Sequence, residues 1–384
     1  MIKIVKITFY TFLLLFMTGC LNNTDHPSNP NDTKPEIIRV KDIDLQGDIK
    51  AGDVYDQVQF IKLETTNKSL FGKIDRIILT KENIYILDWL ISKDIFVFNR
   101  SGKFITRFGQ RGKGPGEFIS PSDFYIDSIN RTIVVLDNGE YLHSYKLINN
   151  TLEFVKTEKI PQEIGPFEVT RIDTNGNFAF ICGRTNPNLC ITDGRFRNIK
   201  YHFPYYNRNF SALLLYSLVY SDKYVLYQRY LNDTIFKLID NLVIPHIVFD
   251  FEQPFTLNNL LKMDNTNQLE NMDKMYKLGS YFELNNMFIF SYSHLGKVFY
   301  LFRNENNQYT HTSKADFVND IYGSGNLNCK GIDPLTKSFI FIASPMNILN
   351  VLNSHPEKLN IKYKRMLNSM NLNDTDNTIL VLLK

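Results

Sequence analysis

The apolar residues of this chain gather in short runs of aromatic and β-branched side chains that recur about every fifty residues. The six runs are NIYILD at 83–88, RTIVVLD at 131–137, NFAFIC at 177–182, KYVLYQ at 223–228, NMFIFSY at 286–292 and SFIFIAS at 338–344. Equivalent positions in them are 84, 133, 178, 224, 288 and 339, so the steps are 49, 45, 46, 64 and 51 residues. Each run is bounded by Gly, Asn, Asp or Pro, as β-strands require.

Most of these runs follow another apolar run by a few residues. The upstream runs are RIILT at 76–80, DFYID at 123–127, EVTRID at 168–173 and SLVYS at 217–221. Three or four strands per unit, repeated six times without helical crossovers, predict an all-β fold, a six-bladed β-propeller spanning residues 37–384. Each blade of such a ring buries its faces against its neighbours, and closure of the ring removes exposed sheet edges.

Two segments have helical rather than strand periodicity. Residues 255–278 place several apolar side chains on one helical face, and Gly279 is expected to stop the helix. This predicts a helical insertion between blades four and five, which explains the step of 64. Residues 354–370 predict a second helical segment before the C-terminal strand, with Ser354 and Glu357 forming a capping box. We expect both to pack on the propeller, and a lid over the channel is the alternative.

The glycine-rich stretch RFGQRGKGPGEF at 107–118 is the first candidate site. A phosphate-binding loop needs Lys and a hydroxyl before a helix, but here Pro115 and Gly116 occupy those places and a strand follows. We therefore interpret the stretch as the corner between two blades, where glycines permit positive φ. Its charged residues Arg111, Lys113 and Glu117 either form an ion-pair cluster that fixes the corner or line a ligand-binding rim.

No catalytic residue, metal site or cofactor is predicted. Asp88 and Asp137 end equivalent strands, and we interpret both as acceptors of backbone N–H groups in the following turn. His143 and His294 could approach one face of the channel, although a lone His is more often a hydrogen-bonded core or surface residue. The Tyr-rich stretch at 201–210 is interpreted as strand packing, with an exposed binding patch as the alternative.

The N-terminus reads as a targeting segment. Lys3 and Lys6 precede an apolar run at residues 7–17, which is shorter than the roughly 20 residues of a membrane-spanning helix, so residues 1–19 are predicted to be a signal peptide. The stretch M17-T18-G19-C20 resembles a bacterial lipobox, which implies cleavage before Cys20 and attachment of a diacylglycerol to its sulfur. A plain secretory signal is the alternative. Residues 20–36 are almost free of apolar side chains and predict a flexible tether.

Charge and cysteine content add two limits. Lys and Arg number 43 against 40 Asp and Glu, a net charge of +3, which gives no reason to expect nucleic acid as a partner. Besides Cys20 the chain has Cys182, Cys190 and Cys329. Two alternatives stay open, a disulfide between Cys182 and Cys190 or three buried thiols. The thiols are favoured.

The first two repeats resemble NHL-type blades, and the chain more narrowly resembles uncharacterised six-bladed β-propeller lipoproteins of Gram-negative anaerobes. The matching motifs are the glycine-rich G109-Q-R-G-K-G-P-G-E-F118 and the ending D376-N-T-I-L-V-L-L-K384. The resemblance implies a lipid-anchored location in the cell envelope, at the outer membrane, facing the periplasm or the exterior. The sequence leaves the leaflet open.

Two functions from different classes follow. The favoured one is a non-enzymatic lipoprotein, with its membrane anchor, that binds a protein, peptide or glycan through a propeller face. The alternative is a hydrolase or lyase with its site at the channel, metal-dependent if carboxylate, Asn or His side chains converge there. A channel lined by aliphatic and aromatic residues would favour binding.

Overall fold

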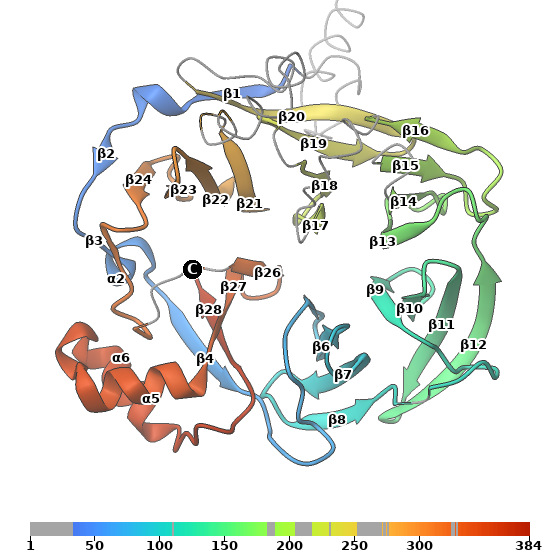
Figure 1. Cartoon of the computed structure of the whole chain (residues 1–384), viewed down its shortest axis with the longest axis horizontal. Helices are drawn as coiled ribbons and strands as arrows, with labels where there is room; N and C mark the ends of the chain where they lie inside the picture. Colours follow the sequence, from blue (N-terminus) through green and yellow to red (C-terminus); the bar gives the residue numbers. More distant parts are fainter. Residues whose placement is uncertain are drawn as a thin grey trace, which may run out of the picture. The chain divides into compact units, whose positions relative to one another are not determined.

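The computed structural model describes residues 34–109, 111–182, 189–203, 217–229, 232–251, 271, 274, 276–323, 327 and 329–384. The chain divides after Pro35, and Glu36–Lys384 forms one unit. Six mainly antiparallel β-sheets are arranged around the centre of this unit as the blades of a β-propeller (Figure 1). The predicted fold class is confirmed.

The first three blades are four-stranded sheets whose strands follow one another in sequence order. Blade one contains β5 (Arg76–Leu79), β6 (Asn83–Asp88), β7 (Asp94–Asn99) and β8 (Phe104–Arg107). Blade two contains β9 (Pro121–Asp127), β10 (Thr132–Asp137), β11 (Tyr141–Ile148) and β12 (Thr151–Lys159). Blade three contains β13 (Pro166–Arg171), β14 (Phe178–Cys182), β15 (Leu189–Thr192) and β16 (Lys200–His202).

The last three blades each include a strand from the N-terminal part of the unit. Blade four contains β17 (Leu218–Tyr220), β18 (Val225–Tyr227), β19 (Thr234–Ile239), β20 (Leu242–Asp250) and β1 (Glu36–Arg39). Blade five contains β21 (Lys277–Leu284), β22 (Met287–His294), β23 (Lys297–Arg303), β24 (Tyr309–Ser313) and β2 (Leu45–Gln46). Blade six contains β26 (Cys329–Asp333), β27 (Ser338–Ala343), β28 (Ile379–Leu383) and β4 (Val58–Lys62).

The segment before blade one therefore runs along the outer edges of three blades. β1 pairs in parallel with β20, and β2 pairs in parallel with β24. A further short strand, β3 (Ile49–Lys50), pairs with β25 (Phe317–Val318). Two single turns, η1 (Val40–Asp42) and α2 (Ala51–Val54), connect these strands. Finally β4, the strand that directly precedes blade one, pairs antiparallel with β28, the last strand of the unit, and this pairing closes the ring.

The fifty-residue period corresponds to the second strand of each blade. The six apolar runs overlap β6, β10, β14, β18, β22 and β27. The four upstream runs overlap the innermost strands β5, β9, β13 and β17. These second strands are almost wholly buried because they have a strand on each side and a blade against each face, which explains their continuous apolar pattern.

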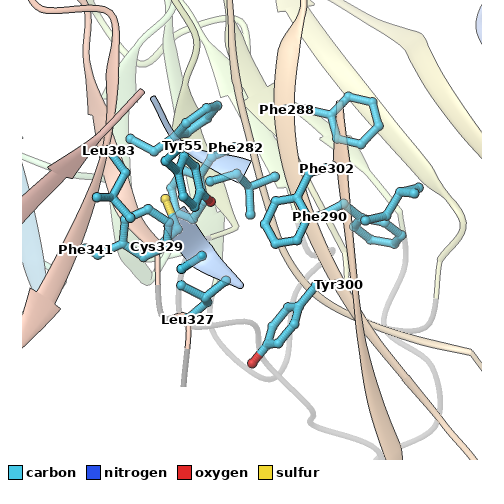
Figure 2. Packing of buried hydrophobic residues seen from close by; sticks show 14 of the residues in the cluster. Tyr55, Phe282, Phe288, Phe290, Tyr300, Phe302, Leu327, Cys329, Phe341 and Leu383 are labelled. Carbon is cyan, nitrogen blue, oxygen red and sulfur yellow. The ribbon is translucent and has the colours of Figure 1, made fainter. Parts of the chain in front are cut away.

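Aromatic side chains fill the space between neighbouring blades. Figure 2 shows one such region, where Tyr55 packs edge-on against Phe302 and Phe341 with ring centroids 6.1 and 5.9 Å apart. Phe249 and Phe290, from blades four and five, stack at 3.8 Å. Buried aromatic pairs of this kind contribute about 0.5–1.5 kcal/mol each beyond their buried area. The N-terminal segment is thus fixed by core packing as well as by strand pairing.

The helical segment before the C-terminal strand is confirmed, but its predicted cap is wrong. It comprises α5 (Pro345–Ser354), η3 (Pro356–Lys358) and α6 (Ile361–Ser369), and α5 was not predicted. Ser354 is the last residue of α5, and the cap of α6 is Asn360, whose side chain accepts a hydrogen bond from the Lys362 N–H at 3.0 Å. Figure 1 shows both helices at the periphery beside β4, away from the channel.

Most of the predicted insertion at 255–278 lies outside the described residues. Its predicted end at Gly279 is wrong, because β21 runs through this position. A Cβ atom at Gly279 would lie 3.1 Å from the carbonyl oxygen of Ser291 and closer still to its side chain. Gly279 therefore permits the close approach of β22 instead of stopping a helix.

The three cysteines within the described residues are buried thiols and form no disulfide. Cys182 and Cys190 lie in one core cluster between blades two and three. A hydrogen bond with the Cys190 thiol, together with burial, raises the pKa of Cys182. Among the helices that the structure describes, none is long and apolar enough to cross a bilayer.

Candidate functional site at the central channel

A cavity of about 560 Å³ lies along the innermost strands of the propeller. Its walls are mainly aliphatic and come from β5, β17 and β26, with single contributions from β9 and β21. The aliphatic and aromatic lining residues are Ile77, Ile78, Leu79, Ile126, Leu218, Val219, Tyr220, Phe282, Ile332, Pro334 and Leu335. The rim is made by the turns that follow these strands and is more polar; it contains Thr80, Lys81, Ser128, Ser221 and Asp333. Arg76 and Lys330 lie at the opposite ends of β5 and β26 from the rim.

The innermost strand of each blade has no strand partner on its channel side. The N–H groups on that side therefore need other hydrogen-bond acceptors. Side chains of the preceding blade supply several of them. Asp123 Oδ2 accepts the Val169 N–H at 2.8 Å, and Gln228 Oε1 accepts the Tyr281 N–H at 2.9 Å. These buried polar side chains therefore join one blade to the next.

Glu168 makes the same kind of connection from blade three to blade four. Its carboxylate accepts the Ser217 N–H at 3.1 Å and the Leu218 N–H at 3.0 Å. Because Glu168 is buried, these bonds replace its lost hydration.

Arg76 is the centre of this buried network. Its Nε lies 3.2 Å from Asp123 Oδ1, and its Nη1 lies 3.8 Å from Glu168 Oε2. Nη1 also donates to the Leu218 carbonyl at 3.3 Å, and the guanidinium lies 5.8 Å from the ring centroid of Tyr220. One side chain of blade one thus contacts blades two, three and four across the channel.

Burial controls the ionisation of these groups. Burial raises the pKa of Glu168 to about 7, with Arg76 opposing the change and Asp123 adding to it. Burial also raises the pKa of Asp123, opposed by Arg76. The pKa of Lys330 is lowered, chiefly by burial and then by the nearby Lys73. Glu168, which contacts Arg76 at the floor of the cavity, therefore changes its charge near neutral pH.

The glycine-rich stretch is the corner that connects β8 of blade one to β9 of blade two. Gly109 and Gly116 have φ values of +62° and +78°, where glycine is favoured. Gly116 packs on Phe154, and its carbonyl accepts the Tyr145 hydroxyl at 3.2 Å. A strand rather than a helix follows, in agreement with the rejection of a phosphate loop.

The charged residues of this corner do not meet one another. Arg111 donates to the Ser92 carbonyl, and Glu117 Oε2 accepts the Gly114 N–H at 2.8 Å. Lys113 is exposed, and none of the ion pairs found in the described part of the chain joins these three side chains. The structure thus gives no ion-pair cluster at the corner, and the ligand-rim hypothesis stays a prediction. The corner contributes nothing to the lining of the channel cavity.

The repeated acids have the structural role that was predicted, with one difference. Asp88 accepts the N–H groups of Ile91 and Ser92 in the following turn at 2.9 and 3.0 Å, and that of Gly72 at 2.8 Å. Asp137 instead accepts N–H groups from Ile119 and Ser120, which precede its own blade. Both acids therefore hold the segment that directly precedes the first strand of their own blade.

The two histidines do not meet at the channel. His143 lies on β11, the third strand of blade two, with Nδ1 2.8 Å from Thr157 Oγ1 and Nε2 3.5 Å from Asp137. His294 ends β22, and its ring stacks on Tyr276 with centroids 3.9 Å apart. Neither lines the cavity. Within the residues that are described, no group of three or more His, Cys, Asp or Glu could hold a metal ion.

Most of the Tyr-rich stretch falls outside the described residues. Of the neighbouring tyrosines, Tyr227 is fully buried, and Tyr220 is within hydrogen-bonding distance of Thr170. Tyr201 is 39% exposed on the outermost strand of blade three. The packing interpretation holds for Tyr220 and Tyr227.

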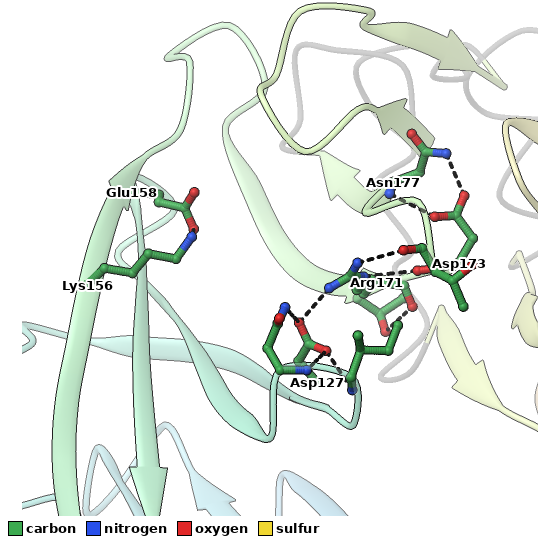
Figure 3. Close-up of polar contacts among 10 residues, drawn as sticks. Asp127, Lys156, Glu158, Arg171, Asp173 and Asn177 are labelled. Atoms are coloured by element: carbon green, nitrogen blue, oxygen red, sulfur yellow. Dashed lines mark hydrogen bonds and ion pairs between the residues drawn. The ribbon is translucent and has the colours of Figure 1, made fainter.

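Another cavity, of about 360 Å³ and with a more polar lining, lies between blades two and three. Figure 3 shows Arg171 in its wall, with Nη1 2.7 Å from Asp127 and Nε donating to the Asp173 carbonyl at 2.9 Å. Lys156 and Glu158 form a pair at 2.8 Å on β12. Arg171 is fully engaged by the turn that follows β13, so this cluster shapes the blade junction.

Sequence reasoning missed the network around Arg76, although a signal was present. Arg76, Asp123 and Glu168 are the first residues of three of the four upstream runs, RIILT, DFYID and EVTRID. A polar residue at the start of equivalent apolar strands indicates an end of the channel where charged groups can meet. Their pairing depends on ring closure, which no local pattern encodes.

The comparisons with known proteins agree with this architecture. A family model described as "Domain of unknown function (DUF4934)" matches residues 35–384. The chain belongs to this family. Among solved structures, the chain is similar to a Bacteroides fragilis protein described as exported, with a TM-score of 0.73, 19% identity, and 91% of this chain and 99% of that chain covered. At this identity the likeness shows the fold alone.

A second structural neighbour is a member of the DUF4221 family from Bacteroides vulgatus. It has a TM-score of 0.48 and 11% identity, and the match covers 86% of this chain and 96% of that one. No curated protein matches the chain.

Proposed function

We propose that this protein is a lipid-anchored protein of the cell envelope that binds a protein, peptide or glycan through the propeller face around the channel rim. The observation that carries this proposal is the character of the cavity, which has aliphatic walls and an accessible polar rim. Ligand-binding sites typically combine apolar walls with a few polar groups that orient the ligand.

The buried carboxylates support binding over catalysis. A general base must reach its substrate's proton with a free oxygen. Asp123 and Glu168 instead direct their oxygens to backbone N–H groups of the next blade and to Arg76. The raised pKa values of Asp123 and of Glu168, the latter near 7, favour the alternative of a channel-centred hydrolase or lyase, because acids with shifted pKa values are common at catalytic sites.

The proposed location rests on the N-terminal segment. The apolar run at 7–17 and the lipobox-like stretch ending at Cys20 support export and lipidation at Cys20, with residues 20–36 as a tether to the outer membrane. The similar Bacteroides fragilis protein, described as exported, is consistent with this location.

Arg111, Lys113 and Glu117 are proposed as a secondary contact region of the same protein. Arg111 and Lys113 are exposed on a corner whose backbone is fixed by Gly116 and Glu117, so their charges are displayed from a defined position. Exposed residues on such corners are often used for binding.

Photo-crosslinking in living cells tests the proposed binding face. A photoreactive phenylalanine analogue replaces Leu335, which is 57% exposed at the rim, and in a matched control it replaces Ile148, which is 42% exposed on β11. We expect an adduct from the rim position and none from the control. Mass spectrometry of the adduct identifies it as protein, peptide or glycan. Equal labelling at both positions, or no adduct at the rim, would contradict the proposal.

A further inference from the structure

We propose that the cavity between blades two and three, the junction cavity, binds an uncharged sugar ring at the end of a glycan. The inference goes beyond the proposed function, because the junction cavity is separate from the channel. Ile126 and Ser128 of β9 line the channel cavity, whereas Tyr125 and Asp127 of the same strand line the junction cavity. Successive side chains of a strand point to opposite faces of its sheet, so the two cavities lie on opposite faces of blade two.

One face of blade two forms most of the wall of the junction cavity. The residues that line it alternate along the four strands and are Tyr125, Asp127, Thr132, Val134, Ser144, Lys146, Lys156 and Glu158. Strand register places them side by side, with Tyr125 opposite Val134, and Val134 opposite Ser144. This alternation means that their side chains, and not only their backbones, face the cavity. The facing wall belongs to blade three and contains Arg171, Gly176, Phe178 and Gly194.

Three hydroxyl groups of this wall lack a partner in the protein. Tyr125, Thr132 and Ser144 are 2%, 6% and 3% exposed. In the described part of the chain, no hydrogen bond involves the hydroxyl group of any of these residues. None of the three oxygen atoms is closed off in the protein interior, so each is open to the cavity that its residue lines. Buried hydroxyl groups need hydrogen-bond partners, and an occupant of the cavity can supply them.

The charged groups of the lining are already paired, which favours an uncharged occupant. Arg171 Nη1 lies 2.7 Å from Asp127, and Lys156 Nζ lies 2.8 Å from Glu158, as Figure 3 shows. Among the described lining residues, only Lys146 is outside an ion pair, and its side chain is exposed to solvent, where an ion pair contributes little. A charged ligand would lose its hydration in the cavity without finding an unpaired buried charge.

A sugar ring combines the two kinds of contact that the cavity offers. Its hydroxyl groups both donate and accept hydrogen bonds, as the three wall hydroxyls do, whereas a peptide residue brings one backbone donor and one acceptor. Its C–H groups can pack against Val134, Val155, Tyr125 and Phe178, whose two rings lie 6.2 Å apart. The volume of about 360 Å³ is near the lower end of the roughly 300–1,000 Å³ of small-molecule sites. The cavity therefore suits the end of a glycan and not a folded partner.

Ligand-observed NMR titration of the full-length protein in lipid nanodiscs tests this inference, with empty nanodiscs as the blank. The uncharged probes are the methyl glycosides of glucose, galactose, mannose, fucose, xylose and N-acetylglucosamine, each at millimolar concentration. Glucuronate and glucosamine are the charged probes. N-acetylalanine methylamide represents an uncharged peptide unit.

The variants Tyr125→Phe, Thr132→Val and Ser144→Ala each remove one hydroxyl group and keep most of the side chain's shape. Because these groups have no partner in the described part of the protein, the variants should unfold at the wild-type temperature. Thr310→Val is the matched control, since Thr310 lies on β24 of blade five and does not line the junction cavity.

We expect at least one methyl glycoside to bind, at least tenfold more tightly than either charged sugar or the peptide unit. Each hydroxyl variant should weaken its binding about threefold to tenfold, which corresponds to about 0.65–1.4 kcal/mol for one lost hydrogen bond. Thr310→Val should bind as wild type does.

Failure of all six methyl glycosides to bind would overturn the inference. So would equal or tighter binding of a charged sugar or of the peptide unit, wild-type affinity in two or more of the hydroxyl variants, or a matching loss in Thr310→Val. These results concern the junction cavity and leave the crosslink at Leu335 untouched, so they are distinguishable from failure of the proposed function.

Discussion

At the scale of single residues, the main finding is that buried acids and amides bridge neighbouring blades. Asp123, Glu168 and Gln228 each accept a backbone N–H from the innermost strand of the following blade. A strand edge buried without such acceptors would lose about 1–3 kcal/mol for each unsatisfied group. The blades are therefore joined at the channel by specific polar contacts in addition to apolar packing.

Glu168 is expected to make stability depend on pH. Its pKa is raised from 4.5 in the unfolded chain to about 7 in the folded protein, so the folded state holds the proton more tightly. The stabilising contribution is complete below pH 4.5 and is lost as the pH rises to about 7, on the order of 3 kcal/mol. Glu168→Gln, which keeps an acceptor oxygen, should remove this contribution.

The measurement is the free energy of unfolding by urea at pH 4.5, 6 and 7.5, compared between wild type and variant. The comparison is needed because burial lowers the pKa of His202, His294 and His311, which gives an opposite trend below pH 6.5 in both proteins. Glu153→Gln, exposed on β12, is the control and should follow wild type. Parallel curves for wild type and Glu168→Gln would contradict the assignment.

At the scale of elements, the second strands were predictable and the helix ends were not. The second strands are buried on both faces, so their apolar runs are visible without any knowledge of the fold. The apolar periodicity of the segment before β28 predicted a helix there. The N-cap of α6, however, depends on where the chain turns between η3 and α6, and this turn is not encoded in the periodicity. Ser354 has the residue type of a cap but occupies a helix end.

The cap of α6 gives a direct test. Asn360→Ala removes the acceptor of the Lys362 N–H and should lower the free energy of unfolding by about 1 kcal/mol. Ser354→Ala should change it by less than about 0.5 kcal/mol, since this exposed residue caps no helix. Urea denaturation of both variants measures the difference. A larger loss from Ser354→Ala than from Asn360→Ala would restore the capping box that the sequence suggested.

At the scale of the whole molecule, closure of the ring creates the candidate site. β4 precedes blade one and β28 is the last strand of the unit, and the two pair over five residues, from Val58–Leu383 to Lys62–Ile379. This pairing places β26 of blade six beside β5 of blade one, so Lys330 and Arg76 line the same cavity. The cavity therefore exists only in the closed propeller.

The proposed membrane anchor also belongs to this scale. Cys20→Ala should abolish incorporation of labelled fatty acid and move the protein from the membrane fraction, because one thioether-linked lipid and its cleavage site would be lost. Ser28→Ala, in the same predicted tether, should leave both unchanged. Retention of label and of membrane fractionation in Cys20→Ala would refute lipidation at this residue.

The number of blades, their second strands, most of the innermost strands and the corner at residues 107–118 were predictable from the sequence alone. These features follow from local rules, namely the burial of second strands and the positive φ of glycines in turns. The folded structure was needed to see that Arg76, Asp123 and Glu168 meet, and that Arg111, Lys113 and Glu117 do not pair. It was also needed to find the aliphatic cavity between β5, β17 and β26. The network and the cavity join residues from different blades, whose relative positions are set by ring closure and not by any spacing along the chain. Within the corner, the backbone conformation directs Arg111 to the Ser92 carbonyl and Glu117 to the Gly114 N–H.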